Sequence, residues 1–132
     1  MKILLSLSLL TLLFTVASCS NYKISESDAI IDYPDEESQY PGGVEQMKKY
    51  LSRNIQYPEN AMQNGDQGKV FVEFIVEKDG SLSNVTVLRG VSKEIDAEAK
   101  RVIEAMPKWT PAVHKKKYVR SRARIPINFI LV

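Results

Sequence analysis

Residues 118–131 read YVRSRARIPINFIL, and this stretch decides the fold because its polarity alternates from one residue to the next. Alternation of this kind is typical of a β-strand with one buried face. The apolar face comprises Val119, Ser121, Ala123, Ile125, Ile127, Phe129 and Leu131, and the polar face comprises Tyr118, Arg120, Arg122, Arg124, Pro126 and Asn128. A proline within a strand is tolerated chiefly where its missing N–H faces away from a partner, so Pro126 predicts an edge strand.

The same proline predicts the direction of the backbone hydrogen bonds. Backbone N–H and C=O groups alternate sides along a strand, as side chains alternate faces. Even-numbered residues should therefore turn their backbone groups toward the open edge together with Pro126, and odd-numbered residues should pair with the neighbouring strand.

Two further strands and a hairpin precede this element. Residues 70–77 alternate between an apolar face (Val70, Val72, Phe74 and Val76) and a face that carries Glu73 and Glu77. Lys78-Asp79-Gly80-Ser81 then favours a tight hairpin turn, and a second strand is expected over residues 82–89.

Helical patterns flank the strands. Val44, Met47 and Leu51 have helical spacing directly after Gly42-Gly43, and a short helix is expected with Pro58 as its first residue and Gly65 at its exit. A third helix is expected between Ser92 and Pro107, with one apolar face formed by Ile95, Ala99, Val102, Ile103 and Met106. This order predicts an α+β fold, in which helices cover one face of a three-stranded, antiparallel or mixed sheet. The crossover helix places the first strand between the other two and leaves the last strand at the edge.

The N-terminus has the pattern of an export signal. Lys2 supplies a positive charge, a largely apolar run follows from Ile3 to Val16, and Val16-Ala17-Ser18-Cys19 resembles a bacterial lipobox. We therefore expect removal of residues 1–18 and acylation of Cys19, which would hold the protein on a membrane. The location expected is the periplasmic side of the cell envelope, with the outer membrane favoured because Ser20-Asn21 resembles an outer-membrane sorting signal.

Residues 19–39 are rich in acidic side chains and poor in large apolar ones. This composition predicts an acidic tether between the lipidated Cys19 and a folded domain at residues 40–132. Ile30-Ile31 is the one apolar pair in this stretch and could instead dock on the edge of the sheet.

The folded region resembles the C-terminal domain of TonB from Gram-negative bacteria. The resemblance covers residues 40–131 and rests on an ordered series of short blocks: Tyr40-Pro41-Gly42-Gly43, Tyr57-Pro58-Glu59-Asn60-Ala61, Gly68-Lys69-Val70, Glu77-Lys78-Asp79-Gly80-Ser81, Leu88-Arg89-Gly90, Pro107-Lys108-Trp109-Thr110-Pro111 and Ile125-Pro126-Ile127-Asn128-Phe129. It implies a periplasmic, non-enzymatic domain linked to TonB-dependent transport across the outer membrane. It also implies that the last strand accepts the TonB box, an extended peptide of an outer-membrane receptor, or a similar peptide of another envelope protein.

Composition argues against several other classes of function. The chain has one Cys, one His, and 18 basic against 16 acidic side chains. We find no nucleophile beside a base, no metal-ligand spacing and no phosphate-binding loop, so neither a catalytic site nor a metal or cofactor is expected. Export and the balanced charge also argue against nucleic-acid binding.

Two functional hypotheses follow. In the first, the edge strand binds a peptide by main-chain pairing, with Arg120, Arg122, Arg124, Pro126 and Asn128 along the site. In the second, the protein is a structural or assembly lipoprotein, whose basic face binds peptidoglycan or a protein partner. This face comprises Lys115, Lys116 and Lys117 together with Arg120, Arg122 and Arg124. Pairing of the arginines with Glu73 and Glu77 across the sheet would instead make this face an ordinary solvated one.

Overall fold

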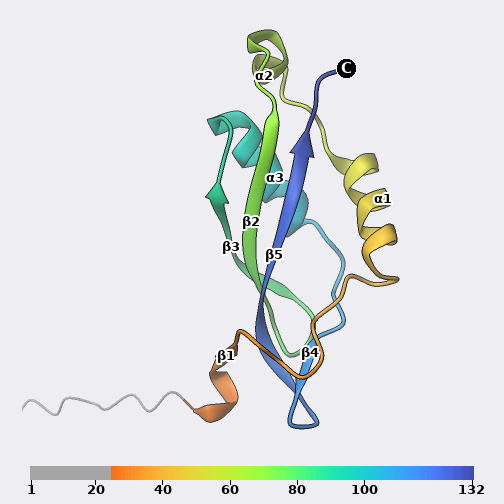
Figure 1. The fold of residues 1–132 in the computed structure, drawn as a ribbon, viewed down its shortest axis with the longest axis vertical. Helices are drawn as coiled ribbons and strands as arrows, with labels where there is room; N and C mark the ends of the chain where they lie inside the picture. Colours follow the sequence, from red (N-terminus) through yellow and green to blue (C-terminus); the bar gives the residue numbers. More distant parts are fainter. Residues whose placement is uncertain (1–24) are drawn as a thin grey trace, which may run out of the picture.

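The computed structural model describes residues 25–132. Figure 1 shows the elements of this part of the chain, in the order η1 (Glu26–Asp28), β1 (Ile30–Ile31), α1 (Val44–Asn54), α2 (Glu59–Asn64), β2 (Gly68–Val76), β3 (Leu82–Arg89), α3 (Lys93–Glu104), β4 (Ala112–His114) and β5 (Lys117–Phe129). The predicted α+β class is confirmed.

The sheet has the order β1-β5-β2-β3, and β4 also pairs with β5. Strand β2 is antiparallel to both of its neighbours, β3 and β5. The relative order of the three predicted strands is therefore confirmed. The predicted number of strands is wrong, because β1 and β4 are two further short strands on β5.

Strand β4 forms a hairpin with the start of β5 that sequence patterns missed. Lys115 and Lys116 make the turn with φ angles of 48° and 62°. Two positive φ angles define the type I′ turn, whose usual signal is Asn-Gly rather than Lys-Lys. The Asp35 side chain accepts a hydrogen bond from the backbone N–H of Lys115 at 2.8 Å, so a residue distant in sequence supports the turn.

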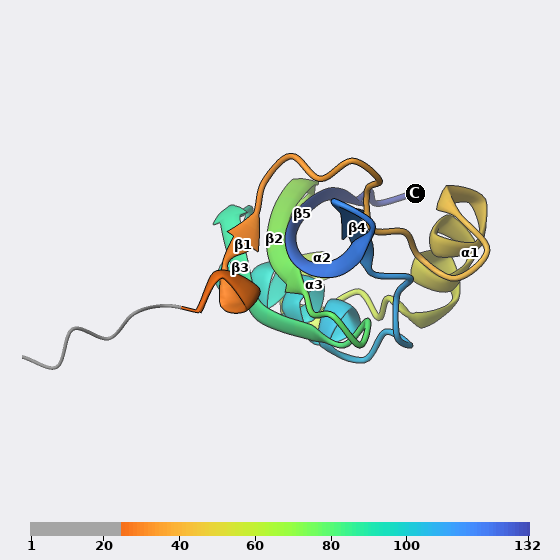
Figure 2. The same cartoon turned by 90° about the horizontal axis from the view of Figure 1, so that it is seen from below.

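The helices begin and end near the predicted signals. Gly43 precedes α1, Gly65 ends α2 in the left-handed conformation, and the Ser92 hydroxyl accepts a hydrogen bond from the backbone N–H of Ile95 at the start of α3. Pro58 is the cap of α2 rather than its first helical residue. Figures 1 and 2 show α3 against the side of the sheet formed by β2 and β3, with α1 beyond the free side of β5.

The core lies between the sheet and α3. Its fully or almost fully buried side chains come from the predicted apolar faces: Val70, Val72, Phe74 and Val76 of β2, Ile125, Ile127 and Phe129 of β5, and Ile95, Ala99, Val102 and Ile103 of α3. The Tyr50 hydroxyl of α1 donates a hydrogen bond to the carbonyl of Val102 at 3.0 Å. Packing of these faces holds β5 in place and leaves its outer side available.

Candidate functional site

The outer side of β5 is only partly paired. Within residues 25–132, β1 pairs with residues 120–121 on this side, whereas β2 pairs along the inner side of β5 from Ser121 to Phe129 and β4 pairs with residues 117–119. From Arg122 to Asn128 the outer side has no strand partner in this described part of the chain. The fold therefore has a free strand edge seven residues long.

Pro126 lies within this free stretch. Its partner in β2 is Phe71, and the register of β2 with β5 continues across that pair without a shift. A proline can occupy a continuous ladder only where its missing N–H is not required. This register supports the prediction that even-numbered residues turn their backbone groups outward, which otherwise stays a prediction.

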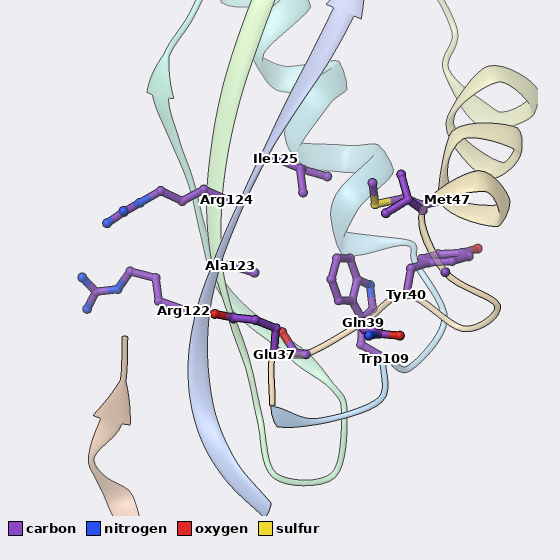
Figure 3. A pocket seen from close by; sticks show the side chains of 12 residues that line it. Glu37, Gln39, Tyr40, Met47, Trp109, Arg122, Ala123, Arg124 and Ile125 are labelled. Atoms are coloured by element: carbon purple, nitrogen blue, oxygen red, sulfur yellow. The ribbon is translucent and has the colours of Figure 1, made fainter. Parts of the chain in front are cut away.

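A groove of about 400 Å³ lies beside the free edge. One wall is β5 from Arg122 to Ile125, and the other is formed by residues 37–40 and the start of α1. In Figure 3 the side chains of Ala123 and Ile125 lie on the side of Tyr40 and Trp109, whereas Arg122 and Arg124 point away from them. The groove thus has apolar side chains on one face of the edge strand.

Aromatic packing makes the far wall of the groove rigid. The Trp109 ring contacts Phe74 and Tyr40 edge to face, with centroids 5.1 Å and 6.0 Å away. Gln39 and Thr110 exchange two backbone hydrogen bonds, of 3.0 Å and 2.8 Å, which hold the chain next to Tyr40 in place. The buried indole N–H of Trp109 has no acceptor among the described residues. The groove is therefore built before any partner arrives.

The three arginines of β5 form ion pairs. Arg120 Nε donates to Glu77 at 2.7 Å and Arg124 Nε donates to Glu73 at 2.6 Å, both across the sheet to β2 or the turn after it. Arg122 Nε lies 3.5 Å from the carboxylate of Asp32. The prediction of a solvated face paired across the sheet is confirmed, and most of the positive charge of this face is compensated.

Of these ion pairs made by the β5 arginines, the pair of Arg120 and Glu77 is the least exposed to solvent. Its hydrogen bond is the main cause that lowers the pKa of the Glu77 carboxyl, against burial, which raises that pKa. Folding therefore favours the ionised carboxylate. The contribution of this pair to stability is present above the usual pKa of a glutamate and is lost as pH falls through the lowered value.

Residues 25–39 lie against the domain in the structure. Ile30 and Ile31 pair in parallel with Arg120 and Ser121, and Arg120 donates to the carbonyl of Asp28 at 2.8 Å. Glu36 forms an isolated bridge with Val113 of β4. Docking of Ile30-Ile31 on the edge, which the sequence left open, is thus observed at Arg120, the first residue of the predicted site, and at Ser121.

The predicted site residues on β5 therefore divide into one that lies beside β1 and four that lie along the free edge. The backbone of Arg120 lies beside β1, whereas Arg122, Arg124, Pro126 and Asn128 lie along the free edge. Cys19 lies outside the described residues. Sequence reasoning missed Tyr40, Met47 and Trp109 as groove residues. No local signal in the sequence marks them, because their position beside β5 depends on contacts between distant residues such as Gln39 and Thr110.

Neither a metal centre nor a membrane span is found in the described part of the chain. Residues 25–132 contain no group of three or more His, Cys, Asp or Glu side chains that could hold a metal ion. None of their helices has the length and apolar character to cross a membrane.

A comparison with one solved structure supports the fold. The solution structure of the Helicobacter pylori TonB C-terminal domain is 23% identical, covers 70% of this chain and 89% of its own, and has a TM-score of 0.52. The Pseudomonas aeruginosa TonB C-terminal domain is 28% identical over 58% of this chain and 78% of its own, with a TM-score of 0.48. A comparison with curated proteins found no match. The family model described as the Gram-negative bacterial TonB protein C-terminal matches residues 53–131, more than half of the chain, and the chain therefore belongs to this family.

Proposed function

We propose that this protein is a non-enzymatic, lipid-anchored component of the cell envelope that binds an extended peptide along β5. The observation that carries the proposal is the free edge from Arg122 to Asn128, with a groove beside it. An added strand would satisfy the open backbone groups, and its alternate side chains would enter the groove. Given the family, the partner we favour is the TonB box of an outer-membrane receptor, which would link the protein to TonB-dependent transport.

The arrangement of the edge narrows the expected binding site. Residues 117–121 already have strand partners, so the peptide would pair with residues 122–128. The side chain of Arg124 is 62% exposed and could still receive an acidic group of the peptide. Apolar contacts with Met47, Trp109 and Ile125 would supply the rest of the selectivity.

The alternative of a structural lipoprotein that binds peptidoglycan through its basic face has less support from the arginines of that face. Arg120 and Arg124 donate short hydrogen bonds to Glu77 and Glu73, and Arg122 lies near Asp32. A surface whose charges are already paired attracts an anionic polymer weakly. We therefore place peptide binding first.

An NMR titration tests the proposal. The chain from residue 19, with Cys19→Ser to prevent acylation, would be titrated with receptor-derived TonB-box peptides. Because a short peptide must be ordered on binding, we expect weak affinity, on the order of micromolar or poorer. Amide shifts should be confined to residues 122–128 and the groove. A scrambled peptide of the same composition is the control, and an absence of shifts at millimolar peptide would refute the proposal.

We also propose that Cys19 is the acylated first residue of the mature protein, as Val16-Ala17-Ser18-Cys19 indicates. Cys19→Ala should leave the precursor uncut or release the protein from the membrane, because the substituted side chain has no thiol to acylate. Fractionation of the envelope and the mass of the N-terminal peptide measure this. A Cys19→Ala protein that is cut after Ser18 and stays in the membrane fraction would contradict the proposal.

A further inference from the structure

The turn between β4 and β5 concentrates positive charge at one end of the molecule. Lys115, Lys116 and Lys117 are consecutive and exposed, and Tyr118 beside them is 61% exposed. None of the three lysines forms an ion pair with another residue of the described range 25–132. In contrast to the arginines of β5, these charges are uncompensated.

The N-terminal segment emerges at the same end. Figure 1 shows η1, β1 and the β4–β5 turn together at the lower end of the molecule, opposite α2 and the C-terminus. The view from below in Figure 2 shows the same elements facing the reader. A depression of about 440 Å³ lies between η1 and the hairpin. The chain that leads back to Cys19 therefore leaves the domain next to the lysines.

The depression combines apolar and basic side chains. Ile31, Tyr118 and Val119 contribute apolar surface to its lining, and Lys78, Lys115 and Lys117 contribute positive charge. Acidic groups at this end include Glu26, which lines the depression, Asp28 of η1, Asp35, which accepts the Lys115 N–H, and Glu36, which bridges Val113 of β4. An apolar floor with a basic rim matches the boundary of a membrane, where acyl chains meet anionic headgroups.

The short stretch of chain between Cys19 and the domain would keep this end of the molecule near a membrane. Ser25, the first described residue, is the sixth residue after Cys19, and an extended chain over that distance spans at most about 20 Å. Attraction to an anionic surface acts within about 8 Å at physiological salt. An anchor at Cys19 is thus short enough to let the lysines come within this range of the headgroups.

We propose that the lysine-rich β4–β5 turn and the depression beside it rest on the anionic phospholipid surface of the anchoring membrane. This contact orients the domain so that the free edge of β5, which lies farther from the turn, faces away from the lipid. The inference rests on the proposed lipid anchor for its orientation, whereas the attraction to phospholipid is a property of the folded domain itself.

The experiment uses the unacylated chain from residue 19 with Cys19→Ser, so that its outcome does not depend on acylation. Binding would be measured by sedimentation with vesicles of phosphatidylethanolamine and phosphatidylglycerol, and with neutral phosphatidylcholine vesicles. The test variant combines Lys115→Asn, Lys116→Gly and Lys117→Gln. Asn-Gly is the preferred type I′ pair, so this variant keeps the turn while it removes three charges.

Each lysine near an anionic surface strengthens binding about fivefold, so the triple variant should bind about a hundredfold more weakly. The control combines Lys48→Gln, Lys49→Gln and Lys93→Gln, which removes three exposed charges from α1 and α3 instead. This control should bind like the parent chain. A thermal unfolding midpoint at or above that of the parent would show that the test variant is folded.

Three results would overturn the proposal. They are equal binding to neutral and anionic vesicles, equal losses in the test variant and the control, and sedimentation with peptidoglycan but not with vesicles. The fate of the lipid anchor is read separately from the Cys19→Ala fractionation. A failure of vesicle binding therefore leaves the anchor untouched, and a failure of the anchor leaves vesicle binding untouched.

Discussion

Gly80→Ala is expected to lower the free energy of unfolding by about 3–5 kcal/mol, the largest effect of any substitution considered. Gly80 has a φ of +87°, a conformation that costs other residues about 1–2 kcal/mol. A Cβ atom there would also lie 2.0 Å from the carbonyl oxygen of Trp109, which is backbone and has little room to move. Relief of that overlap would break the 2.9 Å hydrogen bond from the Trp109 N–H to the Gly80 carbonyl. Denaturant unfolding measures the change.

Gly65→Ala is the matched control. Gly65 has a φ of +72°, but a Cβ atom there would meet nothing within 4 Å. We expect a loss of only about 1 kcal/mol, from backbone strain alone. Similar losses at the two positions would mean that the contact between the hairpin turn and Trp109 is not tight, and the account of a rigid groove wall would then be wrong.

Arg124→Pro is expected to weaken binding of the receptor-derived peptide about tenfold. If even-numbered residues face outward, as Pro126 predicts, this substitution removes one N–H that an added strand would use. The hydrogen bonds between β5 and β2 would stay intact, because the backbone N–H and C=O of residue 124 would both face outward and make none of them. Proline is tolerated at such a position, so the domain should stay folded. The dissociation constant from the NMR titration measures the effect.

Arg124→Ala separates the backbone from the side chain. Both variants lose the ion pair with Glu73, but only proline removes the N–H. The alanine variant should bind the peptide within about threefold of the parent chain, since an exposed ion pair contributes little. Equal affinities for the two variants would contradict strand addition at this edge. Loss of folding in the proline variant alone would instead show that the odd-numbered residues face outward.

The free edge of β5 shows how far sequence reasoning reached. Alternation over residues 118–131 identified the strand and its buried face, and Pro126 identified it as an edge strand. Burial of Ile125, Ile127 and Phe129 confirms the face. The prediction that the whole edge is open was wrong at Arg120 and Ser121, where β1 pairs. A two-residue strand has too little periodicity to stand out within an acidic segment.

The groove shows where local patterns end. Val44, Met47 and Leu51 predicted α1, but no local feature placed the start of that helix beside residues 122–125. The position of Tyr40 depends on two backbone hydrogen bonds between Gln39 and Thr110, which are far apart in the sequence. Contacts of this kind leave no periodic trace, so sequence analysis did not find this wall.

By itself, the sequence determined the elements of the sheet core, the α+β class and the order of β3, β2 and β5. It could do so because strand and helix periodicity, turn residues and proline act over a few neighbouring residues. Only the tertiary structure decided the docking of residues 25–39, the β4 hairpin, the ion pairs of the arginines and the groove. Each of these depends on which distant segments meet. That outcome follows from packing of the whole core, because short segments such as Ile30-Ile31 gain stability only from the surface on which they dock.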